Sequence, residues 1–256
     1  MTQNAKPIFL WDNLMARSGY SLTATSSETG HPVSNLAEWR EYLTWRAGSG
    51  ASQDIKVDCG SGNPQPATAM VIYGHNFYSA GKTKATLYGS NDNLNWTKIV
   101  EQSISSNDVI AKFFNQASWR YYKLNIDSSM YAAEIALLFI GAYLEFPVWP
   151  GAGFDPNQKE TVTESAKSEQ GYLLGTITKF QRRKIALDFK YLTDSFIRNT
   201  FWTFWNAHIP KPFLFAWDKD NHPLETYLVE AADPKLESPY EPAYRSLKME
   251  LVGKVS

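Results

Sequence analysis

Short segments of alternating apolar and polar residues, separated by clusters of Gly, Pro, Asn and Ser, recur through the first half of this chain. Examples are residues 69–73 (AMVIY), 84–89 (KATLYG), 98–104, 119–126 (WRYYKLNI) and 135–146 (IALLFIGAYLEF). Side chains of a β-strand alternate with a period of two, and short strands at this spacing are typical of β-sandwiches and jelly rolls. The pattern therefore predicts a mostly β protein.

One stretch in the second half departs from the strand period and predicts a single helix. Thr193 or Asp194 can cap its N-terminus with a side-chain oxygen, and His208 and Pro210 end it. The residues that share its apolar face are Phe196, Ile197, Thr200, Phe201, Phe204 and Trp205. Trp202 lies off that face, so we expect it either inside the core or at a subunit interface. Expected strands flank the helix at 184–192, 213–217, 226–230 and 246–252.

Pro and Gly interrupt all periodicity in FPVWPGAGFDPNQ, residues 146–158, and we place the domain boundary there. The expected organisation is an N-terminal arm at 1–34, a β-sandwich at 35–147, a linker at 148–170 and a β domain with one packed helix at 171–256. The polar stretch KETVTESAKSEQ, at the end of the linker, fits either a solvated strand or a loop.

Charge and length exclude several classes of function. The formal net charge is −1, with 25 basic and 26 acidic residues, so no electrostatic surface for nucleic acid is expected. No apolar run reaches the roughly 20 residues that span a bilayer, and no signal peptide is expected at the start. The single cysteine, Cys59, forms no intrachain disulfide and is expected to be buried and inert.

No catalytic or metal-binding pattern stands out, so we expect no enzyme and no cofactor. The chain lacks a G-x-S-x-G elbow, and its histidines are scattered among turns. Asp218, Asp220 and Asn221 partly match a calcium loop, but the glycine and distal glutamate of that loop are missing, which favours a turn. Glu134 and Glu145 lie in apolar runs, where a paired structural acid explains them as well as a catalytic one does.

The chain is rich in aromatic residues, at 14 %. Trp39, Trp45, Trp96 and Trp119 fit either the core of the first domain or exposed loops that stack on sugar rings. Under the second interpretation, the candidate glycan contacts are Trp39, Arg40, Trp45, Arg46 and His75.

Residues from about Asn35 to Phe146 resemble the discoidin-like, or galactose-binding-like, jelly roll. The segments that carry the resemblance are NLAEWREYLTWRA, IKVDCG, AMVIYGHN, KATLYGSNDNLNWTKI, WRYYKLNI and AEIALLFIGAYLEF, in that order. The chain has Cys59 and Asn93 where the family usually has Leu and a hairpin Gly. The resemblance implies a β-sandwich whose loops can bind sugars.

Residues from about Gly171 to Val255 look like the β-plus-one-helix belt domain of phage tail-tip proteins. The similar segments are KIALDFKYL, SFIRNTFWTFWNAHI and KPFLFAWD. Proteins of the distal tail class pair such a domain with a sugar-binding-like sandwich. The resemblance therefore implies a structural component of a phage tail tip or baseplate, located in the virion and made in the host cytoplasm.

This resemblance also implies a homo-oligomeric ring, a trimer or a hexamer, that links tail tube, hub and fibres and has other phage tail proteins as partners. A closed ring needs two different surfaces on each copy. The candidate interface residues are Trp11, Phe201, Trp202 and Trp205. The alternative function is a carbohydrate-binding module or adhesin that contacts host surface glycans.

Overall fold

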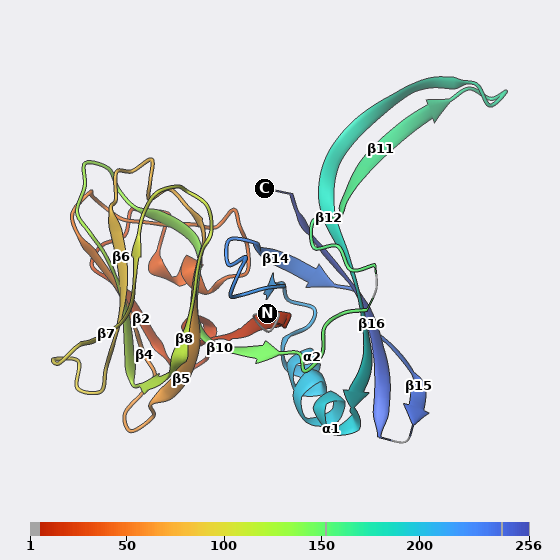
Figure 1. Ribbon diagram of the computed structural model, residues 1–256. Coiled ribbons are helices and arrows are strands. Elements are labelled where there is room, and N and C mark those ends of the chain that lie inside the picture. Colours follow the sequence, from red (N-terminus) through yellow and green to blue (C-terminus); the bar gives the residue numbers. More distant parts are fainter. Residues whose placement is uncertain (1–5, 152, 242, 256) are drawn as a thin grey trace. The chain divides into compact units, whose positions relative to one another are not determined.

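The computed structural model describes residues 6–255 except 152 and 242, and for residues 238–242 it does not describe the side chains. The chain forms two compact units (Figure 1). The sandwich unit comprises Leu10–Leu144 and Asp218–Thr226. The helix unit comprises the described residues of Met1–Phe9, Glu145–Trp217 and Tyr227–Ser256.

Two sheets build the sandwich unit. One has five strands in the order β2-β4-β9-β6-β7, and its neighbours are antiparallel. Its strands are β2 (Ser21–Ala24), β4 (Gln53–Asp58), β6 (Lys84–Ser90), β7 (Thr97–Ser103) and β9 (Tyr121–Ile126). In the other, β10 pairs with β3 and β5, and β5 pairs with β8. These are β3 (Trp45–Arg46), β5 (Gln65–His75), β8 (Ile110–Trp119) and β10 (Glu134–Glu145).

The facing sides of these sheets enclose one apolar core. In β4, Ile55 and Val57 are buried, while Lys56 between them is partly exposed, as the period of a half-buried strand requires. Trp45 and Tyr122 are the largest fully buried side chains in this core. The expected β-sandwich over about half the chain is confirmed by these two sheets. Strand β8 was not expected, because its sequence IAKFFNQASW does not alternate cleanly.

Residues 6–34 of the expected N-terminal arm are part of the two units, and residues 1–5 of that arm lie outside the described residues. Strand β1 (Ile8–Asn13) begins in the helix unit and ends in the sandwich unit, and it is followed by η1 (Leu14–Ala16), β2 and η2 (Val33–Ala37). Asn13 is 3 % exposed. Its side-chain amide donates to Leu138 O over 2.8 Å, and its oxygen accepts from Ile140 N over 3.2 Å and from Met15 N over 3.1 Å. A polar side chain thus joins this segment to the interior of β10, which strand-period arguments do not detect.

Replacing Asn13 with leucine is expected to lower the free energy of unfolding by about 2–3 kcal/mol, because the buried Leu138 carbonyl and Ile140 amide lose their partner. Urea unfolding followed by fluorescence measures this. The control Asn206→Leu, at an exposed helix position, should stay within about 0.5 kcal/mol of wild type. Equal effects of the two variants would contradict the assigned role of Asn13.

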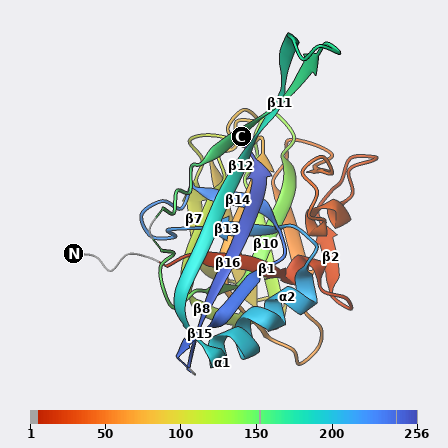
Figure 2. The same ribbon diagram turned by 90° about the vertical axis from the view of Figure 1, so that its right-hand side faces the viewer.

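The helix unit contains a sheet with the order β11-β12-β16-β14-β13, and β15 also pairs with β16. Figure 2 shows β12, β14 and β16 running side by side. The strands are β11 (Lys159–Lys167), β12 (Leu173–Thr193), β13 (Phe213–Ala216), β14 (Thr226–Ala231), β15 (Lys235–Glu241) and β16 (Tyr244–Lys254). The expected linker at 148–170 therefore contains strand β11, and the polar stretch at its end is a solvated strand.

The expected helix begins at Asp194 and ends at His208. Thr193 is its N-cap, and its hydroxyl accepts a hydrogen bond from Phe196 N over 3.2 Å. The helix has three parts, namely α1 (Asp194–Phe196), the π-helical η3 (Ile197–Phe201) and α2 (Trp202–His208). The π-helical turn widens the helix in its middle.

A cluster of buried phenylalanines forms the core of the helix unit. The ring of Phe9 lies 4.8 Å from the rings of both Phe146 and Phe213, measured between centroids. Phe146 stacks on Phe189 of β12 at 4.1 Å, and Phe204 of α2 lies 5.1 Å from Phe213. Edge and stacked pairs of this kind stabilise a core beyond the area that they bury. Phe9 of β1 thus belongs to the same core as the helix. In the part of the chain that the structure describes, no helix has the length and apolar character needed to cross a membrane.

Candidate functional site

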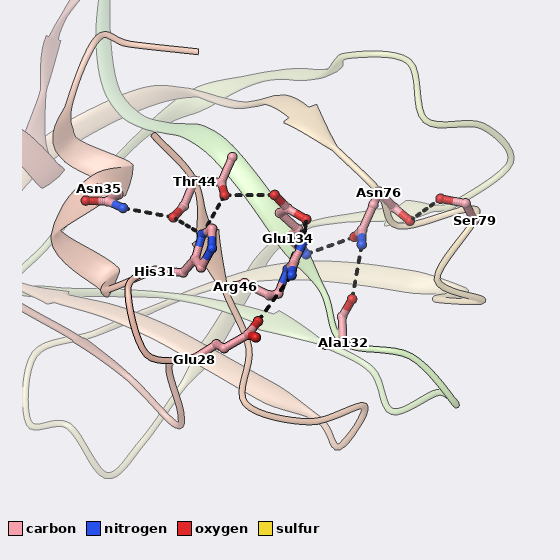
Figure 3. A network of polar contacts seen from close by, with 9 residues as sticks. All are labelled: Glu28, His31, Asn35, Thr44, Arg46, Asn76, Ser79, Ala132 and Glu134. Carbon is pink, nitrogen blue, oxygen red and sulfur yellow. Dashed lines mark hydrogen bonds and ion pairs between the residues drawn. The ribbon is translucent and has the colours of Figure 1, made fainter. Parts of the chain in front are cut away.

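A polar network lies where β3 pairs with the first residues of β10, in the sandwich unit (Figure 3). Its side chains come from β3, from the start of β10 and from three segments that precede or connect strands. We define the polar network as Glu28, His31, Asn35, Thr44, Arg46, Asn76 and Glu134, with Ser79 and Ala132 bonded to its edge.

The central contact of the polar network is a fork between Arg46 and Glu134. Arg46 Nε and Nη2 both donate to Glu134 Oε2, over 3.1 and 2.7 Å, and Arg46 Nη1 donates to Glu28 Oε2 over 3.3 Å. The Arg46 side chain is 40 % exposed and that of Glu134 is 23 % exposed. Register places the two residues directly opposite each other across the β3–β10 pair. Cross-strand pairing thus fixes the guanidinium while part of it still faces solvent.

A second group of contacts orders the segment before β3. The Thr44 hydroxyl donates to Glu134 Oε1 over 2.8 Å, and His31 Nδ1 lies 3.0 Å from that hydroxyl oxygen. The Asn35 side-chain amide donates to the Thr44 carbonyl over 2.9 Å. Each oxygen of Glu134 therefore has a partner, which holds the carboxylate in one orientation.

Asn76 and Lys82 fix the loop after β5. Asn76 Oδ1 accepts from the backbone amide of Glu134 over 2.8 Å, and its amide nitrogen donates to the Ala132 carbonyl over 3.1 Å. The ammonium of Lys82, a residue only 2 % exposed, donates to the carbonyls of Gly50 (2.9 Å) and Asp127 (3.1 Å). Burial lowers the pKa of Lys82. These contacts tie the loops around Gly50, Asn76 and Asp127 to one another.

Three exposed tyrosines stand on the segments that hold the polar network. Tyr42 is 76 % exposed, and Tyr78 and Tyr131 are each 60 % exposed. Tyr42 lies two residues before Thr44, Tyr78 two residues after Asn76, and Tyr131 three residues before Glu134. Each tyrosine is therefore within three residues of a member of the polar network, on a segment that the hydrogen bonds above hold in place. The site thus combines a charged fork with exposed rings.

The fork is ionised at neutral pH. Burial alone would raise the pKa of Glu134, but the hydrogen bonds from Arg46 and Thr44, together with the positive charge of Arg46, bring it below its usual value of 4.5. The carboxylate in turn raises the pKa of Arg46 through their hydrogen bond. The site therefore offers both a fixed donor and a fixed acceptor over the whole neutral range.

Two of the predicted glycan contacts, Trp39 and Trp45, are buried instead. Trp45 is fully covered and Trp39 is 8 % exposed. The Trp45 indole donates to Ser26 O and to Ser27 Oγ, both over 3.1 Å. A covered ring cannot stack on a sugar, so both tryptophans are core residues, which was the other interpretation of the sequence.

His75 is also a structural residue. It is 6 % exposed, its Nε2 lies 2.8 Å from the Asp108 carbonyl, and its Nδ1 accepts from Phe77 N over 3.2 Å. Burial lowers the pKa of His75, so the ring is neutral and both of its nitrogens have partners in the chain. Of the five predicted contacts, only Arg40 and Arg46 have solvent-accessible side chains, and only Arg46 belongs to the polar network.

The predicted interface residues differ in their burial. Phe201 is fully buried and is excluded as an interface residue in this structure. Trp202 and Trp205 are half-buried, and their rings lie 5.5 and 5.8 Å from the ring of Phe201. Trp11, in β1, is half-buried. Trp11, Trp202 and Trp205 thus remain predictions, because each of these residues is only partly buried.

A shallow depression of about 390 Å³ lies on the outer face of the five-stranded sheet. It is lined by Thr23, Ala24, Thr25, Asp54, Lys56, Asn93, Trp96 and Lys123. Lys123 Nζ lies 4.3 Å from the centre of the Trp96 ring and 3.4 Å from Asp54 Oδ2. Because an ammonium already covers this ring, the depression is a weaker stacking site than the tyrosine-bearing loops.

No cluster of three or more potential metal ligands occurs among the described residues. Asp218, in the segment that partly matches a calcium loop, accepts from the backbone amides of Asp220 and Asn221 over 3.2 and 3.0 Å. Its carboxylate therefore closes a turn, as the sequence favours.

Sequence reasoning missed most of the polar network. His31 is expected in a turn without a role, no pattern singles out Asn76, and Glu134 is expected to be either a paired structural acid or a catalytic one. The pairing of β3 with β10 would have indicated the contact, because it places Glu134 directly opposite Arg46. Strand β3 has only two residues, however, and a pattern of two residues does not predict which strand it pairs with.

The chain matches no family model, and no curated protein matches it. Several solved structures resemble about half of it. The Clostridium perfringens module CpGH89CBM32-5, in complex with GalNAc-β-1,3-galactose, is 19 % identical, with 50 % of this chain and 99 % of that chain covered and a TM-score of 0.41. The family 32 carbohydrate-binding module of Clostridium perfringens NanJ, in complex with galactose, is 17 % identical, with coverage of 54 % and 99 % and a TM-score of 0.41.

A third similar structure is a Ruminococcus gnavus GH29 fucosidase, which is 15 % identical with a TM-score of 0.45. The match covers 52 % of this chain but only 27 % of the fucosidase. The β-sandwich described above rests on the strand order of this chain and not on these similarities.

The Arg46–Glu134 fork is expected to contribute to stability in a pH-dependent way. Because the folded-state pKa of Glu134 lies below 4.5, its contribution is fully present above that value and is lost as the pH falls through the folded pKa. The variant Glu134→Gln should be less stable than wild type at pH 7, and the difference should shrink below pH 4.5. Thermal unfolding of both proteins between pH 3 and pH 8 measures this. A difference that is independent of pH would contradict the ionised fork.

Proposed function

We propose that the sandwich unit binds a neutral carbohydrate at the loops that carry the polar network. The observation that supports this most directly is the half-exposed Arg46 guanidinium, held by Glu134 next to loops that bear exposed tyrosines. Sugar-binding sites need rigid polar groups for hydroxyls and ring faces for the apolar side of the sugar.

The charges of the site favour a neutral ligand. Arg46 is matched by Glu134 and also by Glu28, so the network carries no excess positive charge for a sulfate or carboxylate group. A guanidinium donates to a hydroxyl oxygen, and a fixed carboxylate accepts from the neighbouring hydroxyl proton. The fork can therefore bind a vicinal pair of hydroxyls, while Tyr42, Tyr78 or Tyr131 covers the ring.

The test is binding of the purified full chain to a glycan array, followed by calorimetry with the glycans that bind. Galactose, N-acetylgalactosamine and chitosan oligomers are suitable first probes, since similar modules are described with these sugars or are named for chitosan. Arg46→Ala should weaken binding at least about tenfold, equal to 1.4 kcal/mol. At least one of Tyr42→Ala, Tyr78→Ala and Tyr131→Ala should do the same.

The matched control is Arg120→Ala. Arg120 forms a comparable fork with Asp58 in the same unit, with Nε–Oδ1 and Nη2–Oδ2 distances of 2.8 and 2.9 Å, but it lies outside the polar network. It should leave affinity unchanged. Loss of binding in Arg120→Ala alone, or no glycan bound by the wild type, would overturn the proposal.

We propose as a second function that the chain is a structural protein of a phage tail tip or baseplate, with the helix unit as the assembling part. The observation that favours assembly is the set of exposed apolar side chains on the β11–β12 hairpin, because exposed apolar surface of this kind marks interaction sites. Under this proposal other phage tail proteins are the partners, and sugar binding by the sandwich unit adds a contact with the host surface.

The tail proposal predicts that antibodies against the chain label the tail tip of phage particles in electron micrographs. Antibodies against the purified helix-unit variant Trp202→Ala serve as a control for the labelled epitope. Recovery of the chain only in host cell-wall fractions, with unlabelled particles, would contradict this function and leave the sugar-binding proposal intact.

A further inference from the structure

The outer face of the five-stranded sheet carries a row of residues that is separate from the polar network. Register places Thr23, Lys56, Lys123, Tyr88 and Lys98 opposite one another in turn, across β2, β4, β9, β6 and β7. We define the lysine row as these five residues. The chain neighbours of Lys56 and Lys123 are buried in the core, so both lysines point to the outer side of the sheet.

Two like charges meet in the middle of the lysine row. Lys56 and Lys123 lie directly opposite each other on β4 and β9. Like charges in this position destabilise a strand pair, because the two Cβ atoms are only about 5 Å apart. The charge of Lys123 is compensated, since its Nζ lies 3.4 Å from Asp54 Oδ2 and 4.3 and 5.5 Å from the ring centres of Trp96 and Tyr88.

Lys56 has no acidic partner of this kind. Among the described residues, no carboxylate forms an ion pair with it, and its ammonium donates to Asn93 Oδ1 over 3.0 Å. Because the amide oxygen of Asn93 accepts from Lys56, the amide nitrogen of Asn93 remains as a donor. Thr23, opposite Lys56, is exposed. An ammonium, an amide and a hydroxyl thus line the same depression of about 390 Å³.

The five strands carry more ammonium groups than carboxylates are available to match. Their lysines are Lys56, Lys84, Lys98 and Lys123. Asp58 is bound by Arg120, which leaves Asp54 and Glu101 for the four lysines. Asp92, in the turn between β6 and β7, accepts hydrogen bonds within its own turn. The lysine row therefore has an excess of positive charge, although the net charge of the chain is −1.

We propose that the lysine row binds an acidic polysaccharide, with the carboxylate of a uronic-acid residue at Lys56. A shallow depression covers only one side of a free monosaccharide, whereas a chain that repeats the carboxylate can contact several lysines at once. Neighbouring strands lie about 4.8 Å apart, so the row extends over about 14 Å from Lys56 to Lys98. Asn93 and Thr23 supply hydrogen bonds to the sugar hydroxyls.

The aromatic rings of this face favour a sugar acid over a single-stranded nucleic acid. Nucleic-acid sites of that kind stack bases on open rings. Here the ammonium of Lys123 lies against Trp96 and Tyr88, and the guanidinium of Arg120 lies 4.5 Å from the ring centre of Tyr121. The rings hold the cations in place, and recognition is left to charge and hydrogen bonds.

The first test is calorimetry of the purified full chain with an oligogalacturonate. The wild type should bind it, and the methyl ester of the same oligomer should bind at least about tenfold more weakly, because esterification removes the charge and keeps the sugar. Polyglutamate and a single-stranded oligonucleotide of similar charge should also bind at least about tenfold more weakly. Added salt should weaken binding, because it screens exposed charges.

The second test uses variants of the lysine row. Lys56→Glu should weaken oligogalacturonate binding at least about tenfold, while Lys56→Arg, which keeps the charge, should stay within about threefold of wild type. The matched control is Lys112→Glu, in β8 of the other sheet. It changes the net charge by the same amount and should stay within about twofold of wild type. Circular dichroism of each variant checks that the fold is retained.

The contrary results are equally specific. No binding by the wild type, or equal affinity for the ester, polyglutamate or the oligonucleotide, would overturn the inference. Equal loss in Lys56→Glu and Lys112→Glu would show a general effect of charge. Binding that is lost in Arg46→Ala but kept in Lys56→Glu would place the acidic ligand at the polar network. The proposed binding of neutral sugars is measured with other ligands and other variants, so the two proposals fail separately.

Discussion

The apolar face of every strand needs a cover, and this requirement organises both units. In the sandwich unit the two sheets cover each other, so Ile55, Tyr122 and Leu138 are almost completely removed from water. In the helix unit the phenylalanine cluster is covered by the helix and by β1. In the outer part of the β11–β12 hairpin, Ile177 and Phe180 stay exposed, so the described part of the chain does not meet this requirement there.

The polar network depends on the same sandwich. Strand β3 has only two residues, and pairing with β10 alone would hold it weakly. Burial of Trp45 in the core fixes one of these residues, and the alternation of the strand then places Arg46 on the opposite side, toward Glu134. A hydrophobic anchor therefore orients the guanidinium that we propose binds a sugar. Arg46 is held in place because Trp45, its neighbour in β3, is buried in the core.

Helices and strands whose apolar residues recur with a clear period could be predicted from the sequence, and those without a clear period could not. Strands at β5, β6, β9 and β10, and the helix from Asp194 to His208 with its Thr193 cap, agree with the expectation. Asn93, which stands where the resembling family has a hairpin glycine, has a φ of 60°, a conformation that Asn tolerates. Strand β8 and the attachment of β1 were missed, because one does not alternate and the other depends on the buried Asn13 amide.

The sequence by itself determined the mostly β class, the single capped helix and the absence of a recognisable catalytic pattern, because these follow from local period and residue type. Only the tertiary structure decided which aromatic residues are exposed. Trp39, Trp45 and Phe201 are of residue types that are common at binding sites, but they are buried, whereas Tyr42, Tyr78 and Phe180 are exposed. Burial depends on contacts between residues far apart in the chain, such as Arg46 and Glu134, and no local pattern contains that information.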